Sequence, residues 1–316
     1  HLRTGGTYFV SAHGIDLGPE GAYAKHPEYY AQIAGKRQPY QLCVSNPEVV
    51  KLAVAQAKAY FRRYPHEVML GMGPNDGSGF CECPNCRTLD GGEWDAFSKE
   101  PSVSDRYVWF FNRVLQGIED EFPQKKIAFY AYHTYMRPPV KVTPDPRILP
   151  ALAPIALCRV HSMDNPVCPE KRYLQWLYRE WGKRLPEVYD RGYWFNLADP
   201  GFPFPMMSRL RVDIPLAKTL GAKGWRVECM PKWGSESPSL YLAGKLMWNV
   251  DTDVDALLQD YYTKFFGPAA GPMGQYLTLL DAALRDADAH TGCAFDMPYF
   301  YPPAVRAKAR TLLQDA

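Results

Sequence analysis

Short apolar runs alternate with longer segments of helical periodicity in the first 230 residues. Between the runs, apolar residues recur at helical spacing, and Asn46 followed by Pro47 is a typical N-cap and first helical position. The alternation favours a parallel sheet covered by helices. The predicted strands are Gln41–Val44, Glu67–Met72, Lys126–Tyr132, Pro154–Val160, Val188–Phe195 and Gly224–Met230. The predicted helices are Pro47–Tyr64, Ser104–Phe122, Tyr173–Arg184 and Pro205–Leu220.

The pattern changes after Met230, where helical periodicity continues without an intervening strand pattern. Asp253 is expected to cap the second of these helices. We therefore predict a barrel domain over residues 1–235 and a helical C-terminal extension, packed on the barrel, over residues 236–316. The helices predicted in this extension are Ser239–Trp248, Val254–Phe266, Met273–Asp286 and Ala304–Leu313.

The fold predicted from this order of elements is an α/β fold, a (β/α)8 TIM-type barrel. A closed barrel needs eight strands. The segment Leu2–Ala12 is the candidate for a seventh, and at least one more would lie before His1, so the barrel is expected to be N-terminally incomplete. The sequence contains neither GxGxxG nor a Walker motif, which argues against a nucleotide-binding doubly wound sheet.

Charge and hydropathy exclude two classes of partner. The chain has 36 Lys and Arg against 34 Asp and Glu, which is no basic footprint for nucleic acid. No apolar run approaches the roughly 20 residues that a membrane span needs. Aromatic residues make up 14% of the chain, including 21 Tyr and 8 Trp. Most must belong to the core, but aromatic faces also stack on sugar rings.

Two acidic residues are the candidates for catalysis, because barrel active sites form at the carboxyl ends of the strands. Asp76 follows the strand Glu67–Met72, and Glu228 lies within Gly224–Met230. A carboxylic acid and a carboxylate are the pair that glycoside hydrolysis uses. Each residue also has a purely structural alternative. Asn-Asp-Gly is ordinary turn chemistry, and Glu228 has Arg226 on its own strand face as an ion-pair partner.

Further polar and aromatic side chains at the same strand ends are candidates for substrate binding. An arginine there binds a carboxylate through two hydrogen bonds, which points to a sugar containing uronic acid. The alternative is that the arginines pair with Asp76 and Glu228 themselves. The predicted substrate-binding residues are Asn75, His133, Arg159, His161, Trp194, Asn196, Arg226 and Trp233.

Cys81, Cys83 and Cys86 lie within six residues, a spacing similar to part of a zinc knuckle. The fourth ligand is not local, and Cys168, His161 or His133 are candidates to supply it. A disulfide or free thiols are the alternatives to a structural zinc ion. No HExxH occurs, so catalysis is expected to need no metal or other cofactor. The other cysteines are expected to be small core residues, namely Cys43, Cys158, Cys229 and Cys293.

Several segments of the chain, from about His26 to Phe266, resemble the bacterial domain-of-unknown-function family 4838. The segment Asn75–Cys86, with its Asn-Asp-Gly and Cys-x-Cys-x-x-Cys, is the most specific. The resemblance implies a glycoside-hydrolase-like barrel in secreted, polysaccharide-degrading bacterial proteins, with Asp76 and Glu228 at the matching carboxylate positions. It also implies a preceding alpha-glucuronidase-type N-terminal domain and a periplasmic or extracellular location. The other matching segments are His26–Tyr30, Gly35–Arg37, Gln41–Val49 and Tyr241–Asn249.

The sequence therefore predicts a glycoside hydrolase that cleaves a polysaccharide or oligosaccharide with Asp76 and Glu228. Two rival hypotheses remain. The first is a barrel that binds carbohydrate without cleaving it. The second is a zinc-dependent hydrolase that uses the cysteine loop.

Overall fold

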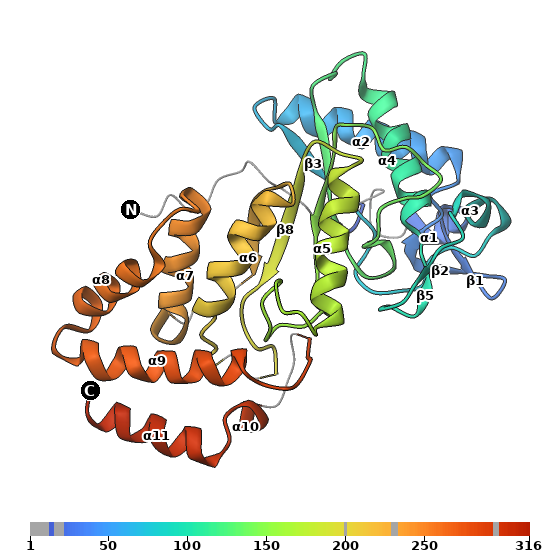
Figure 1. Cartoon of the computed structure of the whole chain (residues 1–316). Coiled ribbons are helices and arrows are strands. Elements are labelled where there is room, and N and C mark those ends of the chain that lie inside the picture. The colour runs from blue at the N-terminus through green and yellow to red at the C-terminus, as the bar shows by residue number, and fades with distance from the viewer. Residues whose placement is uncertain (1–12, 16–21, 199–200, 229–232, 293–296) are drawn as a thin grey trace. The chain divides into compact units, whose positions relative to one another are not determined.

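The computed structural model describes residues 13–15, 22–198, 201–228, 233–292 and 297–316. The chain forms two compact units, which we treat separately (Figure 1). The sheet unit consists of Gly6–Ala153 and Arg179–Arg191. The helical unit consists of His1–Gly5, Pro154–Tyr178 and Gly192–Ala316.

A five-stranded sheet has the strand order β3-β6-β7-β8-β9. The pairs β3–β6, β6–β7 and β7–β8 are parallel, as Leu70 opposite Ile127 and Leu152 opposite Asp190 illustrate. This confirms the predicted α/β class. The five strands described in this sheet are fewer than the eight of a closed barrel, so the (β/α)8 TIM-type barrel stays a prediction. The strand bounds are β3 Met69–Gly71, β6 Lys126–Ala131, β7 Ile148–Leu152, β8 Val188–Tyr193 and β9 Ala222–Glu228.

Two of the predicted strands differ from the structure: one belongs to another sheet, and one is misplaced. Gln41 and Leu42 end β2 (Lys36–Leu42), which pairs antiparallel with β1 (Tyr30–Ile33) in a separate hairpin. The segment Pro154–Val160 forms turns, and the strand lies earlier, at β7. One apolar stretch covers both the predicted and the observed strand. Pro150 suggests that the strand should begin after it, yet Pro150 pairs with Phe129 inside the parallel ladder.

The four helices predicted between the strands are present, with ends shifted by a few residues. Asn46 caps α2 as predicted, because its side chain accepts a hydrogen bond of 2.9 Å from the Glu48 N–H. The helices are α2 Pro47–Arg63, α4 Ser104–Ile118, α5 Pro169–Gly182 and α6 Met207–Thr219. The short elements of this part are α1 Ala22–Lys25, η1 Pro27–Tyr29, α3 Pro84–Leu89, β4 Trp94–Asp95, β5 Glu100–Pro101 and η2 His133–Tyr135.

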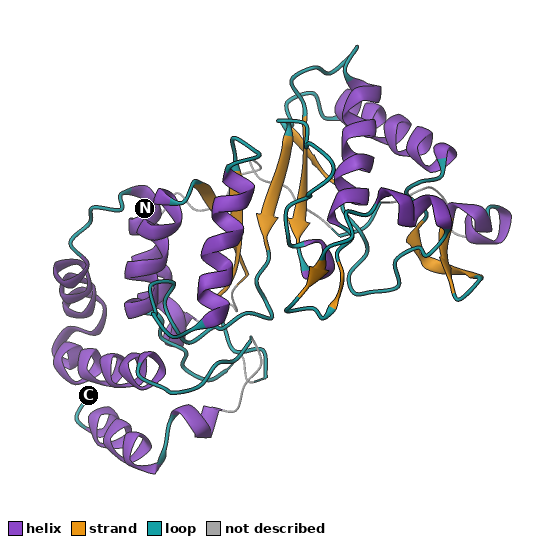
Figure 2. Cartoon of the chain, turned by 45° about the vertical axis from the view of Figure 1, so that its right-hand side comes forward, coloured by secondary structure: helices purple, strands orange, loops and turns teal. Residues whose placement is uncertain are grey.

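The end of the chain is helical, and no strand occurs among its described residues from 233 onward (Figure 2). Asp253 caps α8 as predicted, accepting hydrogen bonds from two backbone N–H groups. Leu242, Leu246 and Leu277 are buried in the core of the helical unit. The predicted boundary between residues 235 and 236 stays a prediction. The helices are α7 Trp233–Trp248, α8 Val254–Phe266, η3 Gly267–Ala269, α9 Ala270–Arg285, α10 Met297–Phe300 and α11 Pro303–Gln314.

Length and hydropathy rule out a bilayer span for every helix in the described part of the chain.

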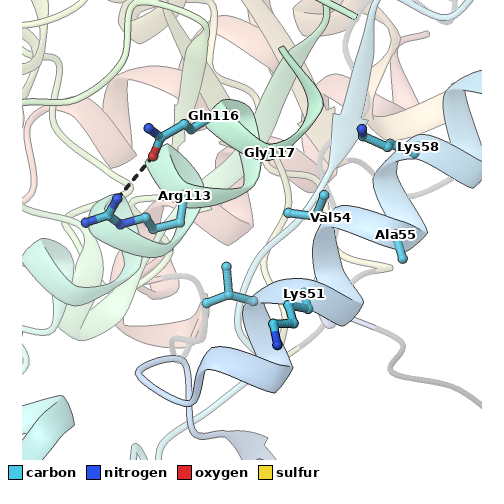
Figure 3. Close-up of a pocket in the computed structure, with 8 residues that line it drawn as sticks. Lys51, Val54, Ala55, Lys58, Arg113, Gln116 and Gly117 are labelled. Atoms are coloured by element: carbon cyan, nitrogen blue, oxygen red, sulfur yellow. Dashed lines mark hydrogen bonds between the residues drawn. The ribbon is translucent and has the colours of Figure 1, made fainter. Parts of the chain in front are cut away.

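Helices α2 and α4 pack closely at Gly117, which faces Val54 (Figure 3). A Cβ at Gly117 would lie 2.5 Å from Val54 Cγ2, closer than real carbon contacts. We expect Gly117→Ala to destabilise the fold by about 1–3 kcal/mol through overpacking, despite the better helix propensity of alanine. Urea unfolding measures the change. Gly271→Ala is the control, since no described atom beyond the neighbouring residues and backbone of α9 lies within 4 Å of its added Cβ. Equal stability of the two variants would contradict this packing.

Candidate functional site

The loop that follows β3 is held by the end of β2. Gln41 is 1% exposed, donates to the Asn75 carbonyl at 2.7 Å and accepts from the Asn75 N–H at 3.0 Å. Tyr40 Oη donates to the Asp76 carbonyl at 2.6 Å, and the Asn75 side chain donates to the Tyr40 carbonyl. Asp76 itself is exposed. The loop therefore has a fixed backbone and presents a carboxylate to solvent.

Histidine and tyrosine side chains gather at the carboxyl end of β6 in the same unit. His133 follows this strand with a φ of 47°, a conformation rare outside glycine. Its buried Nδ1 has no hydrogen-bond partner among the described residues. The ring of His13 lies 4.8 Å from that of Tyr130, and the Arg191 guanidinium stacks on Tyr130 at 5.2 Å. Backbone strain of this kind concentrates at functional sites.

Four buried cysteines lie close together near the loop that follows β3: Cys43, Cys81, Cys83 and Cys86. Their sulfur atoms all lie within 4.8 Å of one another. Cys43 Sγ is 3.7 Å from Cys83 Sγ and 3.9 Å from Cys86 Sγ. Zinc–sulfur bonds of about 2.3 Å in a tetrahedron place sulfur atoms about 3.8 Å apart. The cluster thus has the ligand type, number and spacing of a structural zinc site.

Neighbouring groups orient the four sulfurs. The Gln32 N–H donates to Cys81 Sγ at 3.3 Å, and the Cys86 N–H donates to Cys83 Sγ at 3.4 Å, at the start of α3. Arg106 of α4, which is paired with Asp90, donates to the Cys81 carbonyl at 2.6 Å. N–H groups aimed at sulfur stabilise the thiolate form, as the outer shell of a metal site does.

Hydrogen bonds among the thiols shift their pKa values in opposite directions. Hydrogen bonds shared with Cys43 raise the pKa of the Cys81 and Cys86 thiols, whereas hydrogen bonds from these two thiols lower the pKa of Cys43. A bound divalent cation would stabilise all four as thiolates.

The fourth ligand differs from the sequence prediction. Cys43 completes the cluster, whereas the sequence predicts Cys168, His161 or His133 for this position and a plain core role for Cys43. The six cysteines in the described part of the chain are all free thiols, which gives no support to a disulfide in the loop. Cys229 and Cys293 lie outside the described residues.

Glu228 ends β9 in the helical unit and is half-buried, as is Arg226. The Glu228 carbonyl accepts a hydrogen bond of 2.9 Å from the Trp194 N–H, which fixes its backbone. Asp76 and Glu228 belong to different units. The catalytic assignment of this pair therefore stays a prediction.

The remaining predicted side chains of the helical unit differ in exposure. Trp233 begins α7 and is 47% exposed, as a sugar-stacking surface requires. Trp194 and Asn196 are 5% and 1% exposed, so they contact the protein interior rather than solvent. Asn196 accepts a hydrogen bond from the Ala198 N–H.

Arg159 and His161 do not end a strand, because the segment before them forms turns. The Arg159 guanidinium stacks on the Tyr193 ring at 5.3 Å, and its backbone carbonyl accepts from buried Arg209. His161 lies 3.4 Å from Cys158 Sγ through Nδ1. The turns before them make their predicted positions at a strand end wrong. Both side chains are nearly fully buried, and their substrate roles stay predictions.

A groove of about 510 Å³ lies between α2 and α4 of the sheet unit (Figure 3). Its lining includes Lys51, Lys58 and Arg113 but none of the predicted site residues. Lys58 is paired with Asp120 and Glu121. The groove therefore has no role in the candidate site.

Comparison with known proteins gives one family match. The sequence matches the family model described as Domain of unknown function (DUF4838) over residues 5–278. No curated protein matches the chain significantly. The exo-beta-1,4-mannosidase Op5Man5 from Opitutaceae bacterium strain TAV5 aligns with 90% of this chain and 46% of its own, at 11% identity and a TM-score of 0.36. This chain thus spans about half the length of that structure, and the score is too low to indicate a shared activity.

Proposed function

Because this chain belongs to the DUF4838 family, over residues 5–278, we propose that it is a glycoside-hydrolase-like enzyme that cleaves a polysaccharide or oligosaccharide. The proposal includes a periplasmic or extracellular setting and a (β/α)8 TIM-type barrel fold. It places the chemistry at the carboxyl ends of the parallel strands.

The observation that carries the proposal is the Asp76 loop. This carboxylate follows a parallel strand, is exposed, and stands on a backbone that Tyr40 and Gln41 hold by hydrogen bonds. Catalytic groups need such fixed positions, since misplacement by about 1 Å costs about 10²-fold in rate. Ordinary turns do not need a buried glutamine dedicated to their backbone.

In the proposed reaction, Asp76 and Glu228 are the two carboxyl groups. One protonates the departing glycosidic oxygen, and the other attacks the anomeric carbon or activates water. His133 and Asn75 are proposed to bind the sugar because each follows the end of a strand, and Trp233 because it begins α7 with an exposed ring. Arg226 is proposed to bind a uronic acid carboxylate.

We further propose that Cys43, Cys81, Cys83 and Cys86 hold a structural zinc ion. Four protein ligands fill a tetrahedron and leave no position for water, which is the arrangement of structural sites. The ion would cross-link segments of the chain and take no part in catalysis. It would connect the end of β2, which holds the Asp76 loop, to the segment after that loop. This closed ligand set argues against the zinc-dependent hydrolase.

The test is a screen of oligosaccharides, with and without uronic acid, against the wild-type chain and Glu228→Gln. We expect the wild type to release reducing ends from at least one class and the variant to release almost none. Binding without cleavage after long incubation would instead favour a carbohydrate-binding barrel. Activity that is lost on chelation while the thermal unfolding temperature is unchanged would favour the zinc hydrolase.

A further inference from the structure

A second group of sulfur and nitrogen ligands lies in the helical unit. Cys158, His161 and Cys168 are buried, His290 is exposed, and their ligand atoms all lie within 4.8 Å of one another. Cys158 Sγ is 3.4 Å from His161 Nδ1. Zinc bonds of about 2.3 Å to sulfur and 2.0–2.1 Å to nitrogen place the two atoms about 3.5 Å apart in a tetrahedron.

The hydrogen bonding of His161 orients its ring as a ligand. His161 Nε2 lies 2.9 Å from the Ala287 carbonyl. A carbonyl only accepts, so Nε2 carries the proton and Nδ1 presents its lone pair toward Cys158. Metal-bound histidines have this arrangement, in which the second ring nitrogen donates to a backbone carbonyl. The His290 ring approaches the His161 ring edge-on, with centroids 4.9 Å apart.

The segments that bear these ligands are held independently of any ion. The Asn165 side chain accepts from the backbone N–H groups of Val167 and Cys168, which presents Cys168 at the start of α5. The Arg159 N–H donates to the Thr291 carbonyl at 2.8 Å, next to His290. The site is therefore preorganised between two loops that are far apart in sequence.

We propose that Cys158, His161, Cys168 and His290 bind a second Zn²⁺ ion, in a Cys2His2 site that fastens the Pro154–Cys168 segment to the segment after α9. Four protein ligands make it a structural site. The proposal does not rest on hydrolysis of any glycan, so its failure and that of the proposed enzyme are distinguishable.

A metal analysis of the full chain, purified anaerobically after growth with zinc, tests the proposal. We expect two zinc ions per chain in the wild type and one in His290→Ala and in Cys168→Ser after a chelator challenge. His290 is exposed, so its variant keeps the test valid if Cys168→Ser fails to fold. The control is His66→Ala, another exposed histidine, which should retain both ions.

Two further measurements separate this site from its alternatives. Cobalt substitution in His290→Ala should leave the charge-transfer bands of a four-sulfur site and remove those of a two-sulfur site. Titration of the denatured, metal-free wild type should find all eight cysteines as thiols. Six thiols, owing to a disulfide between Cys158 and Cys168, would overturn the proposal. Equal zinc content in His290→Ala and His66→Ala would also overturn it.

Discussion

Replacement of Glu228 by Gln or of Asp76 by Asn is expected to lower kcat by about 10²–10⁴-fold on the glycan found in the screen. Each amide keeps the size of its carboxyl group but can neither donate a proton to the leaving oxygen nor attack or activate water. A general acid or base contributes about this factor. Initial rates at saturating substrate measure the effect, and thermal unfolding shows whether the fold is retained.

Glu187→Gln is the matched control for these substitutions. Glu187 precedes β8 and pairs with Lys126 at the start of β6, at 2.5 Å, which is the amino end of the parallel strands. Its loss should change stability slightly and leave kcat unaltered. Azide rescue of Glu228→Ala or Asp76→Ala that yields a glycosyl azide of inverted anomeric configuration would identify the nucleophile of a retaining mechanism. Full turnover in both amide variants, with the glycan still cleaved, would remove the pair from the mechanism.

The sequence predicts the helices well because their signals are local. The cap of α2 is contained in Asn46 and Pro47, and that of α8 in Asp253. The strand β7 lies before its predicted position because its five residues belong to a longer apolar stretch, in which no local signal fixes the end. For a similar reason, the sequence does not show that β2 pairs with β1 in a hairpin and not with the strands of the parallel sheet. Pairing partners are a property of the fold, not of the segment.

The candidate sites show the same division between local and distant information. Cys81, Cys83 and Cys86 are recognisable because they are neighbours in the sequence. Cys43 lies 38 residues from Cys81 and resembles any small core residue until the end of β2 approaches the loop. The cluster of Cys158, Cys168 and the two histidines also has ligands more than a hundred residues apart. A single sequence carries no local sign of which distant residues meet in the fold.

Loss of Cys43 should remove one zinc ion and destabilise the sheet unit. Ligand binding stabilises a fold by about 4 kcal/mol when the free ligand exceeds Kd by about 1,000-fold. We therefore expect Cys43→Ser to lower the free energy of unfolding by about 4 kcal/mol, a large part of the roughly 5–15 kcal/mol of a typical domain. Zinc content and urea unfolding measure both changes.

Ser45→Ala separates the loss of a ligand from the loss of a neighbour. Ser45 Oγ lies 3.1 Å from Cys86 Sγ, but a serine hydroxyl is not among the usual ligands of structural zinc sites. This variant should keep its zinc, because the four sulfurs remain. The Cys43→Ser chain should also lose glycan cleavage, since Cys43 follows the two residues that hold the Asp76 loop. Chelation of the wild type should reproduce both losses together. A Cys43→Ser chain with full zinc content and unaltered stability would show that the four sulfurs do not bind a metal.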